Sequence, residues 1–264
     1  MQDFNYHRPA DIAEATRILG EREDAKILAG GMTLIPTLKQ RLAAPSDLID
    51  LSRIPALTGM RRDGYELVIG AMTCHADVAA SALVREMIPA LASLAGQIGD
   101  PAVRHRGTIG GSVANSDPAA DYPAGVLGLD ATVETDRRRI AADDYFTGLF
   151  ETALEPGEII TAIRFKVPAG AAYQKFRHPA SGYAVVGVMV ARFGKDVRVA
   201  ITGAGPNAFR ATAMEAALSV SFSPGALAGI ALDPSELLTD MHASAEYRAH
   251  VASVLAGRAV ASIA

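Results

Sequence analysis

The sequence predicts an α+β protein built from three consecutive domains, residues 1–55, 56–168 and 169–264. In the first two ranges, short apolar runs alternate with helical patterns, whereas the third begins with β-like runs and ends in helices. Strands followed by helices are typical of one sheet covered by a helical layer. With 264 residues, half of them apolar, the chain is long enough to bury a substantial core.

The first domain is predicted from one amphipathic helix followed by two short strands. Asp11–Leu19 carries apolar residues at helical spacing, and Gly20 is expected to close that helix. Apolar runs predict strands at Lys26–Ala29 and Asp47–Leu51. We expect this small α/β unit to end near Pro55.

The second domain is expected to mix strands with helices, the helices lying between Asp77 and Gln97. Its predicted strands are Glu66–Ile69, Ala131–Thr135 and Ile159–Val167. The third domain is expected to hold a three-stranded antiparallel sheet whose strands are Ala172–Phe176, Ala184–Phe193 and Val197–Thr202. Helices follow that sheet, and the last of them is expected from about Ser244 to Ile263.

A glycine pair directly after the strand at Lys26–Ala29 predicts an anion-binding turn. The segment Gly30-Gly31-Met32-Thr33-Leu34 joins the strand to a helix, on which Leu34, Leu38 and Leu42 are spaced for one face. Strand, glycine turn and helix N-terminus together are suited to a phosphate group. The segment matches neither the P-loop pattern nor the G-x-G-x-x-G pattern of dinucleotide-binding domains.

A second segment with the same chemistry spans Arg104 to Pro123. Glycine admits positive φ and lacks a Cβ, so Gly110-Gly111 is expected to let consecutive N–H groups converge on an anion. Asp117-Pro118 is interpreted as an N-cap followed by proline in the first turn of a helix. Side chains able to add hydrogen bonds are Thr108, Ser112, Asn115 and Ser116. The two glycine segments are suited to holding one diphosphate from both sides.

Other groups admit competing interpretations. Gly203-Ala204-Gly205-Pro206 is expected to be a plain turn. Asp117 and Asp121 could form an acid/base pair, but beside a phosphate-type loop they are expected to cap a helix and bind a sugar hydroxyl. Cys74 next to His75 could suggest a thiolate nucleophile, although a small buried residue is expected instead. No catalytic residue is predicted, and no metal site, because the histidines lack metal-ligand spacing.

Composition narrows the class of protein. Lys and Arg total 25 against 29 Asp and Glu, which argues against a nucleic-acid-binding surface. The polar N-terminus lacks a signal-peptide core and no apolar run is long enough to span a bilayer, so a cytoplasmic location is expected. A single cysteine excludes an intrachain disulfide and an iron-sulfur cluster ligated within this chain.

Two long strings resemble the FAD-binding loops of the medium subunit of molybdenum hydroxylases, the family of the carbon monoxide dehydrogenase flavoprotein and the flavin domain of xanthine dehydrogenase. They are LAGGMTLIPTLK (Leu28 to Lys39) and IGDPAVRHRGTIGGSVANSDPAADYPA (Ile98 to Ala124). The resemblance covers essentially the whole chain, since IGAMTCHADVAAS (Ile69 to Ser81) and YQKFRHPASGYAVVGV (Tyr173 to Val188) also look like family segments in order. It implies a PCMH-like FAD-binding fold of two α/β subdomains, followed by a C-terminal α+β domain of the carbon monoxide dehydrogenase flavoprotein type.

The resemblance also implies cofactor-binding residues. On one side of the FAD pyrophosphate it places Ala29, Gly30, Gly31, Met32, Thr33 and Leu34, and on the other Thr108, Gly110, Gly111, Ser112 and Asn115. Asp121 matches a carboxylate that hydrogen-bonds the cofactor, and Thr73 and His75 lie in a segment near it. Lys175, with Arg177 as the rival assignment, resembles a basic residue beside the flavin ring, where a cation would stabilise negative charge.

Two positions depart from the family pattern. Many relatives have Gln or His where Met32 stands, so a side-chain hydrogen bond from that position is lost while the backbone N–H is kept. Ser181-Gly182-Tyr183 stands where many relatives have Ser-Arg-Tyr, which puts any contact made by that arginine in doubt. Neither departure falls on a glycine pair.

The implied function is that of the FAD-binding electron-transfer subunit of a heterotrimeric molybdenum hydroxylase, an oxidoreductase. Electrons would come from the iron-sulfur clusters of a small partner subunit and pass through FAD to an external acceptor. The molybdenum cofactor and the clusters are expected only in the large and small partners, and the assembly is expected to be a dimer of heterotrimers. Two alternatives stay open: a self-sufficient PCMH-type flavin oxidoreductase, and an assembly subunit that has lost the flavin.

Overall fold

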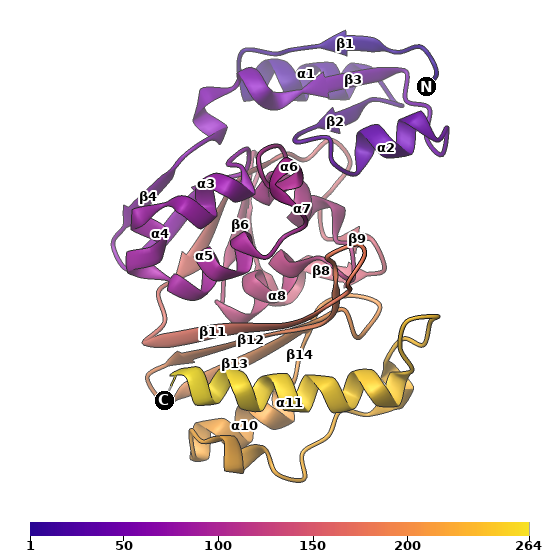
Figure 1. The fold of residues 1–264 in the computed structure, drawn as a ribbon. Helices are drawn as coiled ribbons and strands as arrows, with labels where there is room; N and C mark the ends of the chain where they lie inside the picture. The colour runs from indigo at the N-terminus through magenta and orange to yellow at the C-terminus, as the bar shows by residue number, and fades with distance from the viewer. Residues whose placement is uncertain (264) are drawn as a thin grey trace.

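The computed structural model describes residues 1–263, and its sheets follow one another along the chain from the N-terminal to the C-terminal end of an elongated molecule (Figure 1). Within that range the strands form sheets of three, five, four and two strands. The α+β prediction is confirmed. No helix among the described residues is both long and apolar enough to cross a membrane.

The N-terminal sheet is parallel, with the strand order β1-β3-β2. Its elements are β1 (Asn5–His7), α1 (Ile12–Glu21), β2 (Lys26–Leu28), α2 (Leu34–Lys39) and β3 (Asp47–Asp50), followed by the 3-10 turns η1 (Leu51–Arg53) and η2 (Pro55–Leu57). Asp11 caps α1 by accepting the Glu14 N–H at 2.8 Å. The prediction that Gly20 closes this helix is wrong, because α1 continues through Gly20 to Glu21.

Helix α2 ends earlier than predicted, because the spacing of Leu34, Leu38 and Leu42 indicated a helix that included Leu42. Arg41 adopts φ +60°, and the Leu42 N–H bonds back to the carbonyl of Thr37 at 3.0 Å, which is the geometry of a helix C-terminal stop. Leu42 therefore lies beyond the helix and is 74 % exposed, so it shares no face with Leu34 and Leu38.

The second sheet is antiparallel, with the order β4-β5-β10-β6-β7. Its strands are β4 (Met60–Asp63), β5 (Glu66–Gly70), β6 (Thr132–Thr135), β7 (Arg139–Ala141) and β10 (Ile160–Lys166). The helices of this region are α3 (His75–Ala80), α4 (Ala82–Met87), α5 (Pro89–Gly96), α6 (Pro101–Arg104), α7 (Ile109–Asn115), α8 (Asp121–Gly128) and α9 (Ala142–Tyr145), and β8 (Phe146–Gly148) pairs with β9 (Glu151–Thr152). Apolar residues of α5 and α8 share one core with the inner face of the sheet.

The C-terminal sheet has four strands in the order β11-β12-β13-β14, not the three predicted. Its elements are β11 (Gly170–Arg177), β12 (Ala184–Phe193), β13 (Asp196–Thr202), β14 (Phe209–Arg210), α10 (Thr212–Val220), η3 (Pro224–Leu227), η4 (Pro234–Glu236) and α11 (Ala245–Ile263). The added strand, β14, is only two residues long, which leaves no periodic pattern in the sequence.

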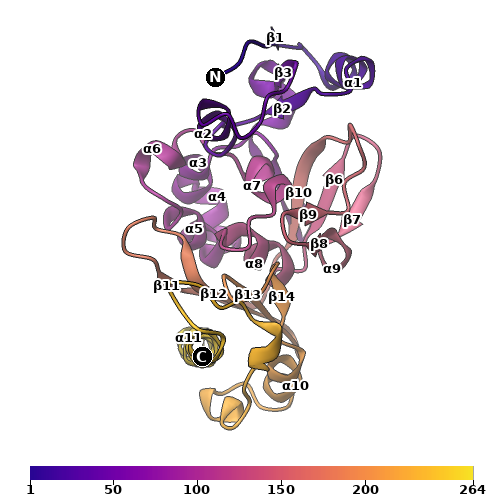
Figure 2. The ribbon, with the colours of Figure 1, turned by 90° about the vertical axis from the view of Figure 1, so that its right-hand side faces the viewer.

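Both faces of the C-terminal sheet are covered, as Figures 1 and 2 show. Side chains alternate along β12, so Val188 and Val190 pack in the core with α10 and α11, while Met189 joins the core of the second sheet and α8. This burial on both faces explains why the sequence of β12 is a nearly continuous run of apolar residues. Helix α8 is thereby fixed between two sheets.

Gly128, in the last turn of α8, permits this close packing. A Cβ at that position would lie 2.5 Å from Cγ and 2.9 Å from Cβ of Met189. We expect Gly128→Ala to lower the stability by about 1–3 kcal/mol, because a methyl group there overpacks the contact. Gly257→Ala in α11 has open space around it and should be neutral or slightly stabilising. Urea unfolding midpoints test this, and equal midpoints for the two variants would contradict it.

Candidate functional site

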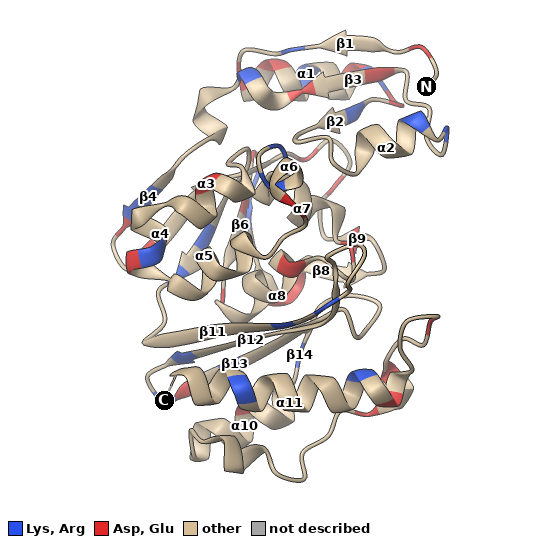
Figure 3. Ribbon diagram, viewed as in Figure 1, with Lys and Arg blue, Asp and Glu red and all other residues tan. Residues whose placement is uncertain are grey.

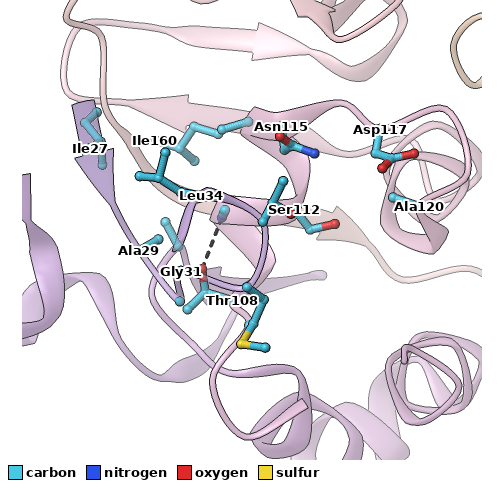
Figure 4. A pocket seen from close by; sticks show the side chains of 18 of the residues that line it. Ile27, Ala29, Gly31, Leu34, Thr108, Ser112, Asn115, Asp117, Ala120 and Ile160 are labelled. Carbon is cyan, nitrogen blue, oxygen red and sulfur yellow. Dashed lines mark hydrogen bonds between the residues drawn. The ribbon is translucent and has the colours of Figure 1, made fainter. Parts of the chain in front are cut away.

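A cavity of about 720 Å³ opens between the N-terminal unit, the helices of the second region and the β11–β12 hairpin. Figure 4 shows Ile27 and Ala29 on one side and Asp117 and Ala120 on the other, with Asn115 between them. A volume of this size is within the range of small-molecule and cofactor sites.

The first glycine segment forms one wall and has unused hydrogen-bond donors. Within residues 1–263, the backbone N–H groups of Gly30 through Leu34 donate to no acceptor, and the first bond of α2 runs from the Ile35 N–H to the carbonyl of Gly31. Gly31 has φ +74°, a conformation that glycine adopts without steric cost. A row of free N–H groups at the start of a helix is a site for an anion.

Gly30 lies directly against the second glycine segment. A Cβ built on Gly30 would be 2.1 Å from the carbonyl oxygen of Arg106 and 2.7 Å from Cα of Gly107. Both of these neighbours are backbone atoms and cannot rotate away. The position therefore requires glycine because of close approach to another loop.

The second glycine segment uses its glycines differently from the prediction. Gly110 and Gly111 lie in the first turn of α7, and neither has positive φ. The Gly110 N–H donates to the carbonyl of Ala71 at 2.8 Å, and the Gly111 N–H donates to Oγ1 of Thr108, the N-cap, at 3.1 Å. The expectation that these N–H groups converge on an anion is wrong, because the protein itself supplies their acceptors.

Asp117 does not cap a helix, contrary to the prediction. Its carboxylate accepts the N–H of Ala119 at 2.9 Å in a tight turn, while α8 begins four residues later, at Asp121, with Ala120 as its N-cap residue. Asp117 does line the cavity, and burial raises the pKa of its carboxyl group.

Asp121 is the acceptor in a buried cluster at the same end of the cavity. Its carboxylate accepts hydrogen bonds from the Tyr173 hydroxyl and, at 2.8 Å, from Nζ of Lys175. Burial raises the pKa of Asp121 against the opposing charge of Lys175, and burial lowers the pKa of Lys175. Figure 3 shows the acidic start of α8 facing the basic residues of β11. Asp121 lines the cavity but Lys175 does not, so Lys175 reaches the site only through Asp121.

Of the predicted residues Thr73 and His75, only His75 reaches the cavity. The Thr73 hydroxyl accepts the Gly59 N–H at 2.9 Å and donates to the Gly59 carbonyl at 3.1 Å; the residue does not line the cavity. His75 does line it, with a buried Nδ1 that has no partner among the described residues. Burial, reinforced by the charge of Arg104, lowers the pKa of His75 to about 4. Burial also raises the pKa of the neighbouring Cys74 thiol, which disfavours the thiolate.

The folded chain gathers most of the predicted residues and adds others. Those that line the cavity are Ala29, Gly30, Gly31, Met32, Thr33, Leu34, His75, Thr108, Gly110, Gly111, Ser112, Asn115 and Asp121. Sequence reasoning missed wall residues at Ile98, Gly99 and Val103, at Leu154 and 157–160, and at Ser181–Tyr183. The first and last groups had a signal, because they lie within the strings 98–124 and 173–188 that resemble the family, whereas Leu154 and 157–160 lie in neither string.

A row of free backbone N–H groups beside a cavity of this size, on an α+β fold, is typical of a protein that binds a nucleotide cofactor. Comparison with known proteins gives the particular family. A family described as the FAD binding domain in molybdopterin dehydrogenase matches residues 2–169, and the CO dehydrogenase flavoprotein C-terminal domain matches residues 171–263. The chain belongs to the family of FAD-binding medium subunits of molybdenum hydroxylases, which are oxidoreductases.

Relatives of similar length support this membership. The carbon monoxide dehydrogenase medium chain of Hydrogenophaga pseudoflava is 37% identical, over 97% of this chain and 96% of its own. The nicotine 6-hydroxylase medium subunit of Paenarthrobacter nicotinovorans is 36% identical, over 93% and 92%. In structure, reconstituted CO dehydrogenase from Oligotropha carboxidovorans matches with a TM-score of 0.91 at 36% identity, covering 98% of this chain and 97% of that one.

The depressed pKa of His75 predicts a pH-dependent stability. Between pH 6.5 and about 4 the unfolded chain binds a proton at His75 while the folded chain does not, so stability falls as pH decreases through this window. The expected loss is on the order of 3 kcal/mol. In a His75→Leu variant this part of the pH dependence should disappear, whereas the exposed control His250→Leu should keep it. Urea unfolding at several pH values measures the slope, and an unchanged slope in His75→Leu would refute the assignment.

Proposed function

We propose that the cavity holds FAD and that this chain is the electron-transfer subunit of a heterotrimeric molybdenum hydroxylase. The observation that carries the proposal is the row of five unpaired N–H groups from Gly30 to Leu34. Such a row is suited to the diphosphate that joins the two halves of a dinucleotide. Bound FAD would supply the capacity to accept electrons and release them singly or in pairs.

The residues at the cavity fit this cofactor. Met32 contributes its backbone N–H, so its departure from the family pattern leaves the row of donors intact. Across the cavity, the side chains of Ser112 and Asn115 make no hydrogen bond within residues 1–263 and are free to bind a ligand. Asp121 would accept from a cofactor hydroxyl, and the neighbouring Lys175 would hold that carboxylate in place.

The partners and the domain organisation complete the proposal. Because its relatives are named as medium chains and medium subunits, we expect a large subunit with the molybdenum cofactor and a small subunit with iron-sulfur clusters. The expected assembly is a dimer of heterotrimers, with an external electron acceptor. Residues 1–55, 56–168 and 169–264 are proposed as its domains.

Substitution in the first glycine segment tests the site directly. Gly31→Ala places a methyl group at φ +74° and 2.9 Å from Cγ1 of Ile35, so the N–H row should lose its geometry. We expect FAD affinity to fall roughly tenfold or more, given a backbone strain of about 1–3 kcal/mol. Gly229→Ala is the matched control, because Gly229 has φ +79° but open space around it. Flavin fluorescence titration of the cofactor-free protein measures both affinities.

The same titration with FMN and ADP separates the alternatives. FMN lacks the diphosphate and should bind more weakly than FAD, whereas ADP should compete with FAD. If wild-type protein bound FAD no better than FMN, or if Gly31→Ala bound FAD normally, the site assignment would fail. Complete absence of flavin binding would favour the assembly subunit, and turnover of a substrate by the isolated chain would favour the self-sufficient oxidoreductase.

A further inference from the structure

Three basic side chains converge on one short loop in the cavity wall, directly after α5. Lys175 Nζ donates to the Gln97 carbonyl at 3.2 Å, and Arg104 Nη1 donates to the Ile98 carbonyl at 2.8 Å and the Gly99 carbonyl at 3.2 Å. Arg177 Nη2 also donates to the Gly99 carbonyl, at 2.9 Å. Cations at the C-terminal end of a helix are favoured by the exposed carbonyls and the helix dipole.

Arg177 differs from the other two because it connects separate parts of the wall. It is the last residue of β11, and the hairpin loop that follows brings Ser181, Gly182 and Tyr183 to the cavity. Gly99, whose carbonyl accepts the Arg177 hydrogen bond, also lines the cavity. The hydrogen bond from Arg177 to Gly99 therefore ties the hairpin loop to the loop after α5.

The guanidinium group of Arg177 also covers Gly182. A Cβ on Gly182 would lie 2.7 Å from Nη2, 3.2 Å from Nε and 3.3 Å from Cζ of Arg177. Only glycine leaves room for the guanidinium group in this position, and Gly182 further adopts φ +74°. In this chain the space beside position 182 is therefore occupied by the guanidinium group of Arg177.

We propose that Arg177 is a latch that holds the hairpin loop 178–183 closed over the Asp121 end of the cavity and slows the release of FAD. This inference rests on the proposed function. Arg177 is a positioning residue, since it acts through Gly99 and Gly182, both of which line the cavity. Burial raises the pKa of Asp121, and the positive charge of Arg177 acts in the opposite direction.

The rate of FAD release tests the latch. From FAD-loaded protein, Arg177→Ala should release the cofactor roughly tenfold faster, the effect expected from losing one hydrogen bond to a charged donor. Arg177→Lys keeps the charge but lacks the planar fork, so it should restore the slow release only in part. The matched control is Arg62→Ala, which removes an exposed arginine bonded to Glu86 outside the cavity wall.

Two further measurements separate a latch from a general structural role. The urea unfolding midpoint of cofactor-free Arg177→Ala should fall no further than that of the control Arg62→Ala, because each variant loses an exposed arginine that makes a hydrogen bond. Gly182→Ala should also speed release, and by less when Arg177 is already alanine, since the clash with the guanidinium group is then absent and only the backbone strain at φ +74° remains.

The possible failures are distinguishable. If wild-type protein binds FAD and Arg177→Ala releases it at the wild-type rate, the latch is overturned while the proposed function stands. The latch is also overturned if the midpoint of cofactor-free Arg177→Ala falls well below that of Arg62→Ala, because the residue would then support the fold as a whole. If wild-type protein binds no FAD, the proposed function fails and the latch fails with it.

Discussion

The backbone of Gly30 lies so close to the carbonyl of Arg106 that no side chain fits between them. This contact fastens the end of β2, in the N-terminal sheet, to the turn before α7, in the second region. The segments on its two sides both line the cavity. The close approach of these two parts of the cavity lining therefore depends on the absence of one Cβ atom.

The two glycine pairs serve different physical purposes. In the first segment, Gly31 supplies the left-handed conformation that leaves a row of N–H groups free. In the second, Gly110 is helical, and its N–H is bonded to Ala71, on which it packs so closely that a Cβ would be 2.5 Å from that of Ala71. The first segment therefore leaves its backbone N–H groups free at the cavity, whereas the N–H groups of the second glycine pair are used within the protein and only side chains such as Asn115 face the cavity.

Strand positions could be predicted from the sequence because apolar runs such as Glu66–Ile69 are local signals, and β5 extends that run by a single residue. The role of a glycine could not be predicted from the sequence, because it depends on which residue packs against that glycine in the folded chain. Ala71 packs against Gly110 in this way. The role of Asp117 could not be predicted either, because its carboxylate accepts an N–H within a tight turn and does not cap a helix. Wall residues such as Leu154 and Ile160 reach the cavity only in the folded chain, so no motif or spacing in the sequence marks them.

The most direct measurement compares how tightly wild-type protein and two glycine variants bind ADP. ADP carries the diphosphate of FAD without the flavin. If the Gly30 contact determines the geometry of the diphosphate site, Gly30→Ala should bind ADP at least about tenfold more weakly than wild type, since its Cβ would meet fixed backbone atoms. Gly20→Ala, in the open on α1, should bind like wild type. Equal affinity of Gly30→Ala and wild type would show that the contact between the two segments does not shape the site.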